Sequence, residues 1–349
     1  METVNQTQAA RRVILEVTID GFDAASYLEP SLLSFEYTDQ AAGKSDEIQL
    51  ELHDRDDRWI NGWLPRKGSV IMARLRCLDW LGVGQHMLLE CGTFKCDEPA
   101  DYKGPPNRVS VKAVSAALTN ELRETTRTRG WENFSLQGVA SDIAGRHGLR
   151  LFYEAPDHQF QRQDQRRESD LAFLQRLAKA RGVNLKVHDG RLVLYSAQDA
   201  DSREAALVIT RRSGEQFTAQ DYSFKIKSED TGYDGAKVEY HEPATRELRQ
   251  VEYRSPGQRD GEGKILSIDS RVESEADALN LAQSRLREAN KGELTGSFTI
   301  MGHPGLYAGM TVQMEDFGIF SGKYFVEKVT HKAGDKYTSS ADIRQVLDF

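Results

Sequence analysis

The chain has 349 residues, of which 39% are hydrophobic and 29% are charged, and its formal net charge is -8 at pH 7. This composition excludes a disordered polymer, and the length favours two to four domains over a single core. The excess of 54 acidic over 46 basic residues argues against a protein whose main work is to grip phosphate backbones, although nucleic acid could slide past an acidic wall.

The first part of the chain and its cysteines indicate the cellular compartment. Residues 1–12 are polar and end in two arginines, which predicts an N-terminal arm rather than a signal peptide. No later segment is apolar over the length of a bilayer, so we expect a cytosolic product with no membrane insertion. Cys77, Cys91 and Cys96 suit neither a disulfide framework nor a zinc site, which predicts buried, reduced thiols.

Residues 13–116 carry alternating apolar and polar side chains, a pattern typical of strands with one buried face. The alternation begins at 13–19 and recurs at 47–52, 70–77, 88–96 and 108–114, with Gly, Pro and Asp clusters between the runs. Five or six such strands suit a β-barrel or a β-sandwich. We therefore expect residues 13–116 to form a first domain.

Residues 117–200 differ in character, because one helix-turn-strand pattern occurs in them twice at an offset of 34 residues. Ser135 and Ser169 are each placed to cap a helix, and Gly148 and Gly182 each stand where a left-handed residue ends one. Both copies carry an apolar helical stripe and then a strand pattern. The stripes are Val139, Ala140, Ile143 and Ala144 in the first copy and Phe173, Leu174, Leu177 and Ala178 in the second.

Two shorter features complete this predicted α+β module. Residues 155–168, which join the two copies, are strongly polar and predict an exposed connector. Asp189-Gly190 is a two-residue hairpin signal ahead of an apolar strand over 192–195.

Residues 201–349 return to strand patterns and predict a further sheet domain. Strands are expected from 207 onward and at 222–226, 237–240, 297–300, 310–314, 323–330 and 337–346. One helix is predicted over 274–291, with Ser274 as its cap and Gly292 as its stop; its stripe is Leu279, Ala282, Leu286 and Ala289. The Gly-rich segment 255–263 lacks the ending of a phosphate loop and predicts a mobile loop.

No residue stands out as catalytic, cofactor-binding or metal-binding. The run 54–58 lacks the glycine and the distal glutamate of a calcium loop, so it predicts a solvated turn. His188 and His331 are expected at strand ends or turns, as surface or hydrogen-bonded histidines. Neither a nucleophile elbow nor a phosphate loop is present, and the prediction is a non-enzyme without a cofactor. Carboxylate pairs stay open, because 54 acidic residues make some of them neighbours.

Two segments, within residues 168–192 and residues 302–337, resemble the phage late control D family, the baseplate hub proteins of contractile tails, which are related to the hub part of type VI secretion spike proteins. Residues 168–182, a short strand and then Asp189-Gly-Arg-Leu192 are similar to the family's central signature. Residues 302–312, followed by 322–331 and Tyr337, are similar to its C-terminal pattern. The likeness spans nearly the whole chain and is most specific in the middle.

The resemblance implies a mixed α+β, mainly β fold, in which two tail-tube-like β-barrel domains flank the small module. The domains would span 13–116, 117–200 and 201–349 after the arm, with the module outside a ring. Three chains would form a homotrimeric, pseudo-sixfold ring that joins the sixfold tail tube to the threefold central spike. Rigid interfaces would pass load from a contracting sheath to the spike and then release it.

The resemblance also implies partners and a location. The partners are the tail tube or a tube-initiator protein, the central spike protein, other baseplate proteins and, as a further candidate, the tape measure protein. DNA can pass through the lumen without specific binding. The protein would be made and assembled in the host bacterial cytoplasm and would reside in the virion, at the tail baseplate.

Two other functions stay open. A tail-tip peptidoglycan hydrolase would work through a carboxylate pair. The chain shows no lysozyme-like insertion and no C-terminal spike extension, so hydrolase and spike are expected to be separate proteins. A carbohydrate-binding receptor module would present exposed aromatic platforms, whereas the four tryptophans, Trp59, Trp63, Trp80 and Trp131, are scattered.

Overall fold

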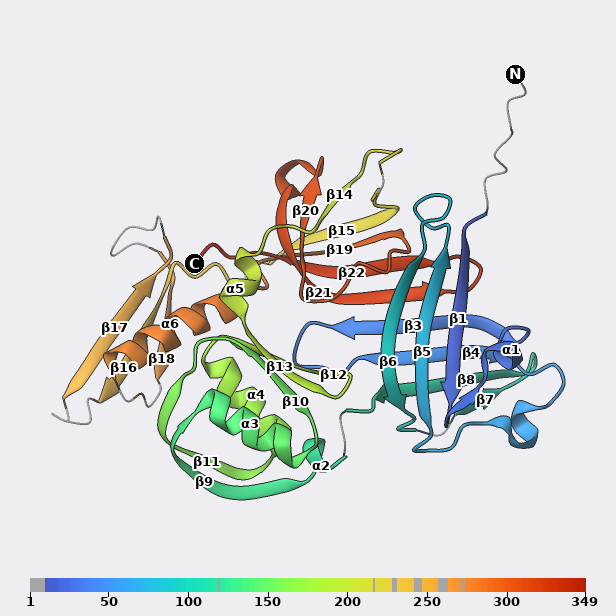
Figure 1. Cartoon of the computed structure of the whole chain (residues 1–349). Helices are drawn as coiled ribbons and strands as arrows, with labels where there is room; N and C mark the ends of the chain where they lie inside the picture. Colours follow the sequence, from blue (N-terminus) through green and yellow to red (C-terminus); the bar gives the residue numbers. More distant parts are fainter. Residues whose placement is uncertain are drawn as a thin grey trace.

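The computed structural model describes residues 10–98, 100–117, 120–215, 217–227, 231–241, 247–256, 263–269, 272 and 274–349. Residues 1–9 of the predicted arm and most of the predicted mobile loop lie outside these ranges. The described chain is mainly β, as the sequence predicts (Figure 1). None of its described helices combines the length and the apolar character that a bilayer crossing needs.

One sheet runs through most of the molecule. Its N-terminal strands are β1 (Arg12–Ile19), β2 (Phe22–Asp23), β3 (Leu32–Gln40), β4 (Glu47–His53), β5 (Val70–Leu78), β6 (Met87–Lys95), β7 (Asp101–Lys103) and β8 (Arg108–Ser115). Its C-terminal strands are β14 (Leu207–Thr210), β15 (Asp221–Ile226), β19 (Leu294–Met301), β20 (Thr311–Glu315), β21 (Gly322–Ala333) and β22 (Thr338–Gln345). The strand patterns predicted at both ends of the chain are thus confirmed.

The two sets of strands are joined into a single sheet rather than two. The sheet order is β15-β19-β22-β21-β3-β4-β8-β6-β5-β1-β2, with β7 paired to β8 and β14 paired to β20. The joint lies between β21 and β3, where residues 328–333 pair antiparallel with residues 35–40. Pairing between strands nearly three hundred residues apart leaves no local pattern, which is why the sequence predicts separate sheets.

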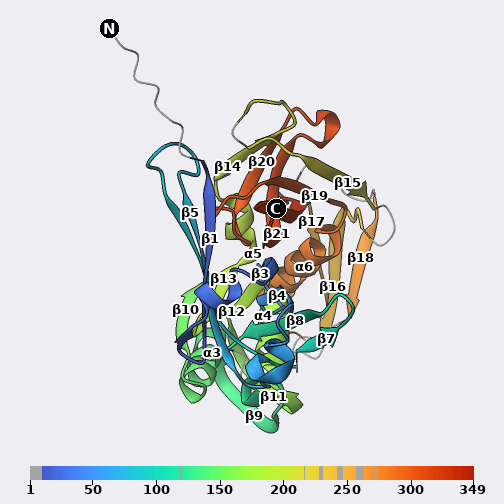
Figure 2. The same ribbon diagram turned by 90° about the vertical axis from the view of Figure 1, so that its right-hand side faces the viewer.

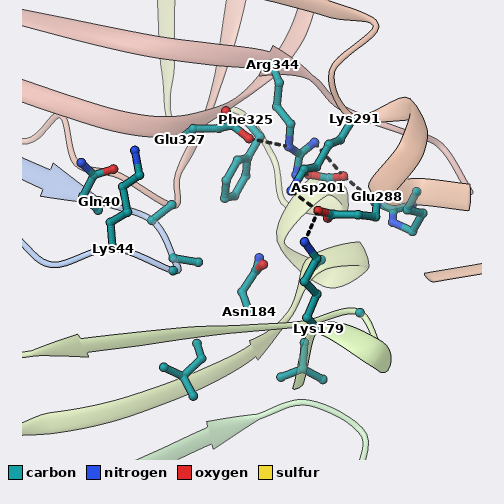
Figure 3. Close-up of a pocket in the computed structure, with 18 of the residues that line it drawn as sticks. Gln40, Lys44, Lys179, Asn184, Asp201, Glu288, Lys291, Phe325, Glu327 and Arg344 are labelled. Carbon is teal, nitrogen blue, oxygen red and sulfur yellow. Dashed lines mark hydrogen bonds and ion pairs between the residues drawn. The ribbon is translucent and has the colours of Figure 1, made fainter. Parts of the chain in front are cut away.

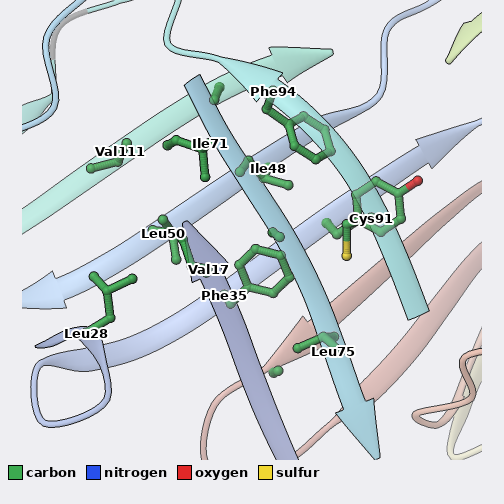
Figure 4. Packing of buried hydrophobic residues seen from close by; sticks show 14 of the residues in the cluster. Val17, Leu28, Phe35, Ile48, Leu50, Ile71, Leu75, Cys91, Phe94 and Val111 are labelled. Atoms are coloured by element: carbon green, nitrogen blue, oxygen red, sulfur yellow. The ribbon is translucent and has the colours of Figure 1, made fainter. Parts of the chain in front are cut away.

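Eight of these strands, β15, β19, β22, β21, β3, β4, β8 and β7, run side by side, and we call them the long layer (Figure 1). Every neighbouring pair in the long layer is antiparallel. Strands β6, β5 and β1 cross its N-terminal half and enclose a hydrophobic cluster against it (Figure 4). Strands β20 and β14 lie beside its C-terminal half (Figure 2). A second hydrophobic cluster lies between them and that half. Each half of the layer therefore has its own core.

The three cysteines belong to the first cluster. Cys77, Cys91 and Cys96 are buried and free, which confirms the prediction of reduced thiols in the core. Burial raises the pKa of the Cys77 thiol to about 12 and that of Cys96 to about 11, and it also raises the pKa of Cys91. These thiols stay protonated at neutral pH, so they behave as small apolar side chains.

The duplicated unit forms a module below the long layer. Its elements are α2 (Asn120–Arg123), β9 (Thr126–Ser135), α3 (Leu136–Arg146), β10 (Arg150–Glu154), β11 (Gln159–Ser169), α4 (Asp170–Ala180), β12 (Val183–His188) and β13 (Arg191–Ser196). Ser135 accepts from the Gly138 N–H at 3.0 Å and Ser169 from the Ala172 N–H at 3.2 Å, so both predicted caps are confirmed. Both apolar stripes are buried together. Asp189 and Gly190 make the predicted hairpin between β12 and β13.

The predicted connector is wrong, because most of it is strand β11, paired antiparallel with β9. Its side chains are mainly Gln, Arg and Glu, and three are buried: Phe160 in the apolar cluster, Gln165 and the cap Ser169. The repeated unit is therefore strand-helix-strand, with β9 before α3 and β11 before α4. A polar strand whose partner lies in the other copy gives no alternation to detect.

A separate three-stranded sheet packs on helix α6 (Glu275–Asn290). Its strands are β16 (Gly235–His241), β17 (Leu248–Arg254) and β18 (Ile265–Asp269). Ser274 caps this helix as predicted, through the Asp277 N–H at 3.2 Å. The predicted stripe is partly wrong: Leu279 is 43% exposed, and Leu281 is buried instead. The helix presents residues 278, 281, 282 and 286 to the sheet, and Leu279 lies at the margin of this face.

Short helices lie at the margins of the sheet. They are α1 (Ala25–Leu28), η1 (Trp59–Trp63), α5 (Ala197–Ser202) and η2 (Gly318–Phe320).

Candidate functional site

The long layer has one apolar face and one polar face. Along each strand the side chains alternate, and one set is buried in the two hydrophobic clusters. We call the other set the polar face: residues 34, 36, 38 and 40; 47, 49, 51 and 53; 101 and 103; 108, 110 and 112; 221, 223 and 225; 295, 297 and 299; 328, 330 and 332; 338, 340 and 342. At the strand ends, Val114 and Met301 interrupt the alternation, and Arg344, opposite Thr295, is left out of the set because it is buried with Asp201.

The polar face is balanced in charge. It carries six acidic residues, Asp101, Asp221, Asp342, Glu36, Glu47 and Glu51, and six basic residues, Lys103, Lys112, Lys225, Lys328, Lys332 and Arg108. Most of the others are Ser, Thr or Gln. The acidic wall considered from the net charge is therefore not found here. A balanced, hydroxyl-rich surface neither binds phosphate strongly nor repels it.

Side chains on the polar face bond to one another across strands. The hydroxyls of Ser223 and Ser297 lie 2.8 Å apart, as do those of Thr299 and Ser340. Lys332 on β21 lies 3.9 Å from Glu36 on β3, across the joint. These contacts tie one strand to the next, so the face is a continuous surface over both halves of the layer.

A bulge ends the polar face on β21. Val326 pairs with Ile343 and Lys328 with Asp342, so Glu327 is an extra residue. Before the bulge β21 pairs with β20, and after it β21 pairs with β3.

A buried histidine holds the apolar side of the joint. His331 on β21 lies opposite Tyr37 on β3. Its Nε2 atom donates to the Leu306 carbonyl at 3.0 Å, and Nδ1 lies 2.9 Å from the hydroxyls of both Tyr337 and Ser339. Burial lowers the pKa of His331 to about 4, so the ring is neutral at pH 7. The prediction of a hydrogen-bonded histidine is confirmed, and His331 lies near a strand end, two residues before Ala333 at the end of β21.

An ion-pair cluster joins the module to the long layer. Lys186 on β12 binds the buried Asp39 and lies 3.6 Å from Asp46. His188, at the end of β12 as predicted, lies 2.6 Å from the other Asp46 oxygen. Burial raises the pKa of the Asp39 carboxyl, although Lys186 opposes the rise. The Ala308 N–H also donates to Asp39 and the Gln40 N–H to Asp46, at 2.8 Å and 2.9 Å.

Asp39 and Asp46 are also a neighbouring carboxylate pair, the arrangement that a hydrolase would need. They are only 6% and 1% exposed, and each of their four oxygens has a partner. A pair held in this way fixes two parts of the fold and is not open to a polysaccharide.

A cleft of about 490 Å³ lies between the end of the long layer, the module and α6 (Figure 3). Asp201 on α5 is buried there between two arginines, Arg287 of α6 and Arg344 of β22. Glu288 binds Lys179 at 2.8 Å and Lys291 at 2.7 Å. Each carboxylate thus connects its own element to another one. The cleft therefore lies at a junction that ion pairs hold together.

The other residues singled out in the sequence have local roles. Asp54 is buried and accepts from the Trp59 and Ile60 N–H groups at 3.1 Å, whereas residues 55–58 are exposed, so the predicted turn is solvated except at Asp54. Trp59, Trp80 and Trp131 are buried, and only Trp63 is substantially exposed, at 41%. Trp63 lies edge-on to the exposed Tyr27, with ring centroids 5.4 Å apart, so the exposed tryptophan belongs to a small aromatic group and the other three lie in the core.

The polar face is the feature that sequence reasoning missed. Its signal is the Ser, Thr or charged residue at every second position of the strands, as in Thr295, Ser297 and Thr299. That signal identifies one face of a strand, but not which strands share the face.

Comparison with known proteins connects this architecture to one family. The model of the phage tail baseplate hub (GPD) family matches residues 37–337. The probable baseplate hub protein of Escherichia phage 186 is 25% identical, with 95% of this chain and 92% of that protein covered. The probable baseplate hub protein of Escherichia phage P2 is 28% identical over 57% of this chain and 50% of that protein.

Solved structures show the same fold. The 43 kDa tail protein of prophage MuSo2 from Shewanella oneidensis superposes with a TM-score of 0.70 at 13% identity, covering 94% of this chain and 97% of that chain. The Escherichia coli c3393 protein, a component of the type VI secretion system, gives a TM-score of 0.52 at 11% identity, covering 96% and 76%. The family match extends from the joint strand β3 almost to β22 and confirms the resemblance found in the sequence. The chain belongs to the phage tail baseplate hub (GPD) family.

Proposed function

We propose that three copies of this baseplate hub protein form a ring whose channel is lined by the polar face. The single observation that carries the proposal is the long layer: eight antiparallel strands, four from each half of the chain, with one continuous polar surface. A sheet that is apolar on one side and polar on the other suits a wall between a core and a water-filled lumen.

The layer also suits a match between threefold and sixfold symmetry. Its halves, β15-β19-β22-β21 and β3-β4-β8-β7, contribute the same number of strands, so three chains would present six similar wall segments. At a strand spacing of about 4.8 Å and a tilt of about 40°, three such layers close into a barrel roughly 45 Å across between backbones. A ring of this kind can bind a sixfold tail tube at one rim and a threefold spike at the other.

The proposal assigns a position to each predicted domain and a role to the channel and the hub. Residues 13–116 and 201–349 are the two barrel-like domains of each subunit, and residues 117–200 are the module, at one rim outside the channel wall. The balanced polar face lets DNA pass without specific binding. The hub has a mechanical role and no active site: it passes load from a contracting sheath to the spike, alongside other baseplate proteins and the tape measure protein.

The test is the native mass of the purified protein, combined with low-resolution particle images. We expect the mass of three chains and a threefold annulus with an open centre. A compact single-copy particle, which stays single when the tube and spike proteins are added, would overturn the proposal. A cell-wall degradation assay addresses the mechanical role, because clearing of peptidoglycan by the purified chain would favour a hydrolase instead.

A further inference from the structure

The long layer ends in two strands that each have an unoccupied side within the described chain. At one end β15 pairs with β19, and at the other end β7 pairs with β8. Neither strand has a second ladder partner among the described residues. Exposed strand edges offer a row of backbone donors and acceptors, which proteins usually cover or pair.

The directions of these two strands suit a seam between rotated copies. The long layer holds eight strands and every neighbouring pair is antiparallel, so β15 and β7 run in opposite directions. Rotation about a ring axis keeps the direction of each strand along that axis. The β15 strand of one copy therefore meets the β7 strand of the next in antiparallel orientation, like every other pair in the layer.

In both strands the polar side chains lie on the polar face and the aromatic side chains lie on the apolar side. Asp221, Ser223 and Lys225 of β15 lie on the polar face, as do Asp101 and Lys103 of β7. Tyr102 lies on the opposite side, packed against the first hydrophobic cluster. Tyr222 and Phe224 likewise lie on the apolar side. Pairing of the two edges would therefore continue both faces without a break.

Among the registers that keep these faces, two neighbouring ones are complementary in charge, whereas a further shift of two residues either way would set Asp101 opposite Asp221 or Lys103 opposite Lys225. One register places Lys103 opposite Asp221, and the register shifted by two residues places Asp101 opposite Lys225. Opposite charges directly across an antiparallel pair are stabilising, whereas like charges are not. Both alignments therefore favour the contact.

The apolar side of β15 carries a partly uncovered aromatic group. Phe224 stacks on Phe320 at 4.7 Å, and Phe317 contacts Tyr222 at 5.0 Å and Phe224 at 5.5 Å. These rings line a recess of about 250 Å³. Beside them Tyr222, Ile226 and Ile319 are 43%, 61% and 85% exposed. Apolar residues gathered at an open strand edge mark a surface that a protein partner covers.

We propose that β15 of one copy pairs with β7 of a second copy of this chain, which covers the aromatic group and closes the long layer into a ring. The joint between β21 and β3 inside one chain is the template for this seam, since it is also an antiparallel pair with one polar and one apolar side. The proposal rests on the ring proposed above and assigns its contact between subunits.

Engineered cysteines test the seam directly. The three native cysteines are buried, so a chain carrying Ser223→Cys and Asp101→Cys offers one new thiol at each end of the layer. We expect oxidation to give covalent dimers and trimers on a non-reducing gel, with Lys103→Cys in place of Asp101→Cys if the other register is used. The control pair, Ser223→Cys with Thr330→Cys in the middle of the layer, should give no link between copies.

A second measurement keeps the test independent of cross-linking. Ile226→Asp and Ile319→Asp alter exposed side chains and should not disturb folding, yet each should lower the native mass from three chains toward one. Leu248→Asp on β17 is the matched control, since Leu248 is also exposed, at 64%, but lies outside the seam. Trimers that survive both seam variants and show no cross-link would overturn this inference and leave the ring standing. A wild-type chain that never forms trimers would instead overturn the proposed function.

Discussion

His331 and Tyr37 face each other directly across the joint of the long layer, with their rings stacked at 6.0 Å and an interplanar angle of 10°. Three polar groups depend on the same histidine: the Leu306 carbonyl and the hydroxyls of Tyr337 and Ser339. One buried polar network therefore supports the apolar side of the joint between the two halves of the chain.

Replacing this histidine should weaken the joint. His331→Leu keeps most of the volume but leaves the three buried polar groups without their partner, so we expect a loss of about 2–4 kcal/mol in the free energy of unfolding. Denaturant titration measures the loss. Lys332→Leu, one residue along the same strand and 58% exposed at its side chain, is the control and should change stability by less than about 0.5 kcal/mol. Equal effects of the two variants would contradict the assigned role.

The same histidine should make stability depend on pH. Its pKa falls from 6.5 in the unfolded chain to about 4 in the folded protein. Its contribution is therefore complete above pH 6.5 and is lost as pH falls toward 4, because the unfolded chain binds the proton first. A shift of this size corresponds to about 3 kcal/mol. Unfolding midpoints between pH 7.5 and 4.5 should fall more steeply for the wild type than for His331→Leu, and parallel profiles would refute the prediction.

Asp170 should be the most sensitive charge in the module. It is buried at the start of α4, 2.7 Å from Arg146, 3.0 Å from His147 and 3.3 Å from Arg127. Asp170→Asn removes the shared anion, and we expect a loss of about 3–5 kcal/mol. Asp142→Asn is a matched control, because Asp142 also binds Arg146 at 2.7 Å but is 43% exposed, so its loss should stay below about 1 kcal/mol. Thermal unfolding of both variants decides the comparison.

Asp170 should also make the stability of the folded protein depend on pH in the acid range. Burial raises the pKa of its carboxyl, but hydrogen bonds from Gln165 and His147 and the charges of Arg146 and Arg127 outweigh burial and hold the pKa below its usual range. The stabilisation is therefore complete above about pH 4 and is lost as pH falls further. The wild type should lose stability below pH 4, whereas Asp170→Asn should lose less over the same range. A variant as acid-sensitive as the wild type would argue against this source.

The two glycines of the duplicated unit allow a comparison within one molecule. Gly148 and Gly182 share a φ of +65°, so alanine at either site should cost about 1–2 kcal/mol from backbone strain. A Cβ at Gly148 meets open space, whereas at Gly182 it would lie 3.3 Å from Ser284 on α6. We expect Gly182→Ala to be the more destabilising of the two by chemical denaturation. Equal losses would show that the packing of α6 on the module adjusts freely, and the reverse order would contradict the prediction.

The sequence-based predictions were most accurate where the signal lies within a few neighbouring residues. Ser135, Ser169, Gly148 and Gly182 act within a single turn, so the duplicated unit is legible without a structure. Features that depend on residues distant in the sequence could not be predicted from the sequence. Strand β11 was missed because its side chains are mostly polar and exposed and its partner β9 belongs to the other copy of the unit, and Leu279 was wrongly assigned to the buried stripe because it lies at the margin of the face of α6 that meets the sheet. The polar face needs eight strands from both ends of the chain before it exists at all.

The extra residue Glu327 explains how one strand, β21, can pair with β20 before the bulge and with β3 after it. Val326 and Val329 both point into the second cluster although three positions separate them, and only a bulge reconciles that spacing with the period of two in a strand. Deleting Glu327 would leave each neighbouring side chain on its own face but straighten the strand. The bend between the part of β21 that pairs with β20 and the part that pairs with β3 would then disappear.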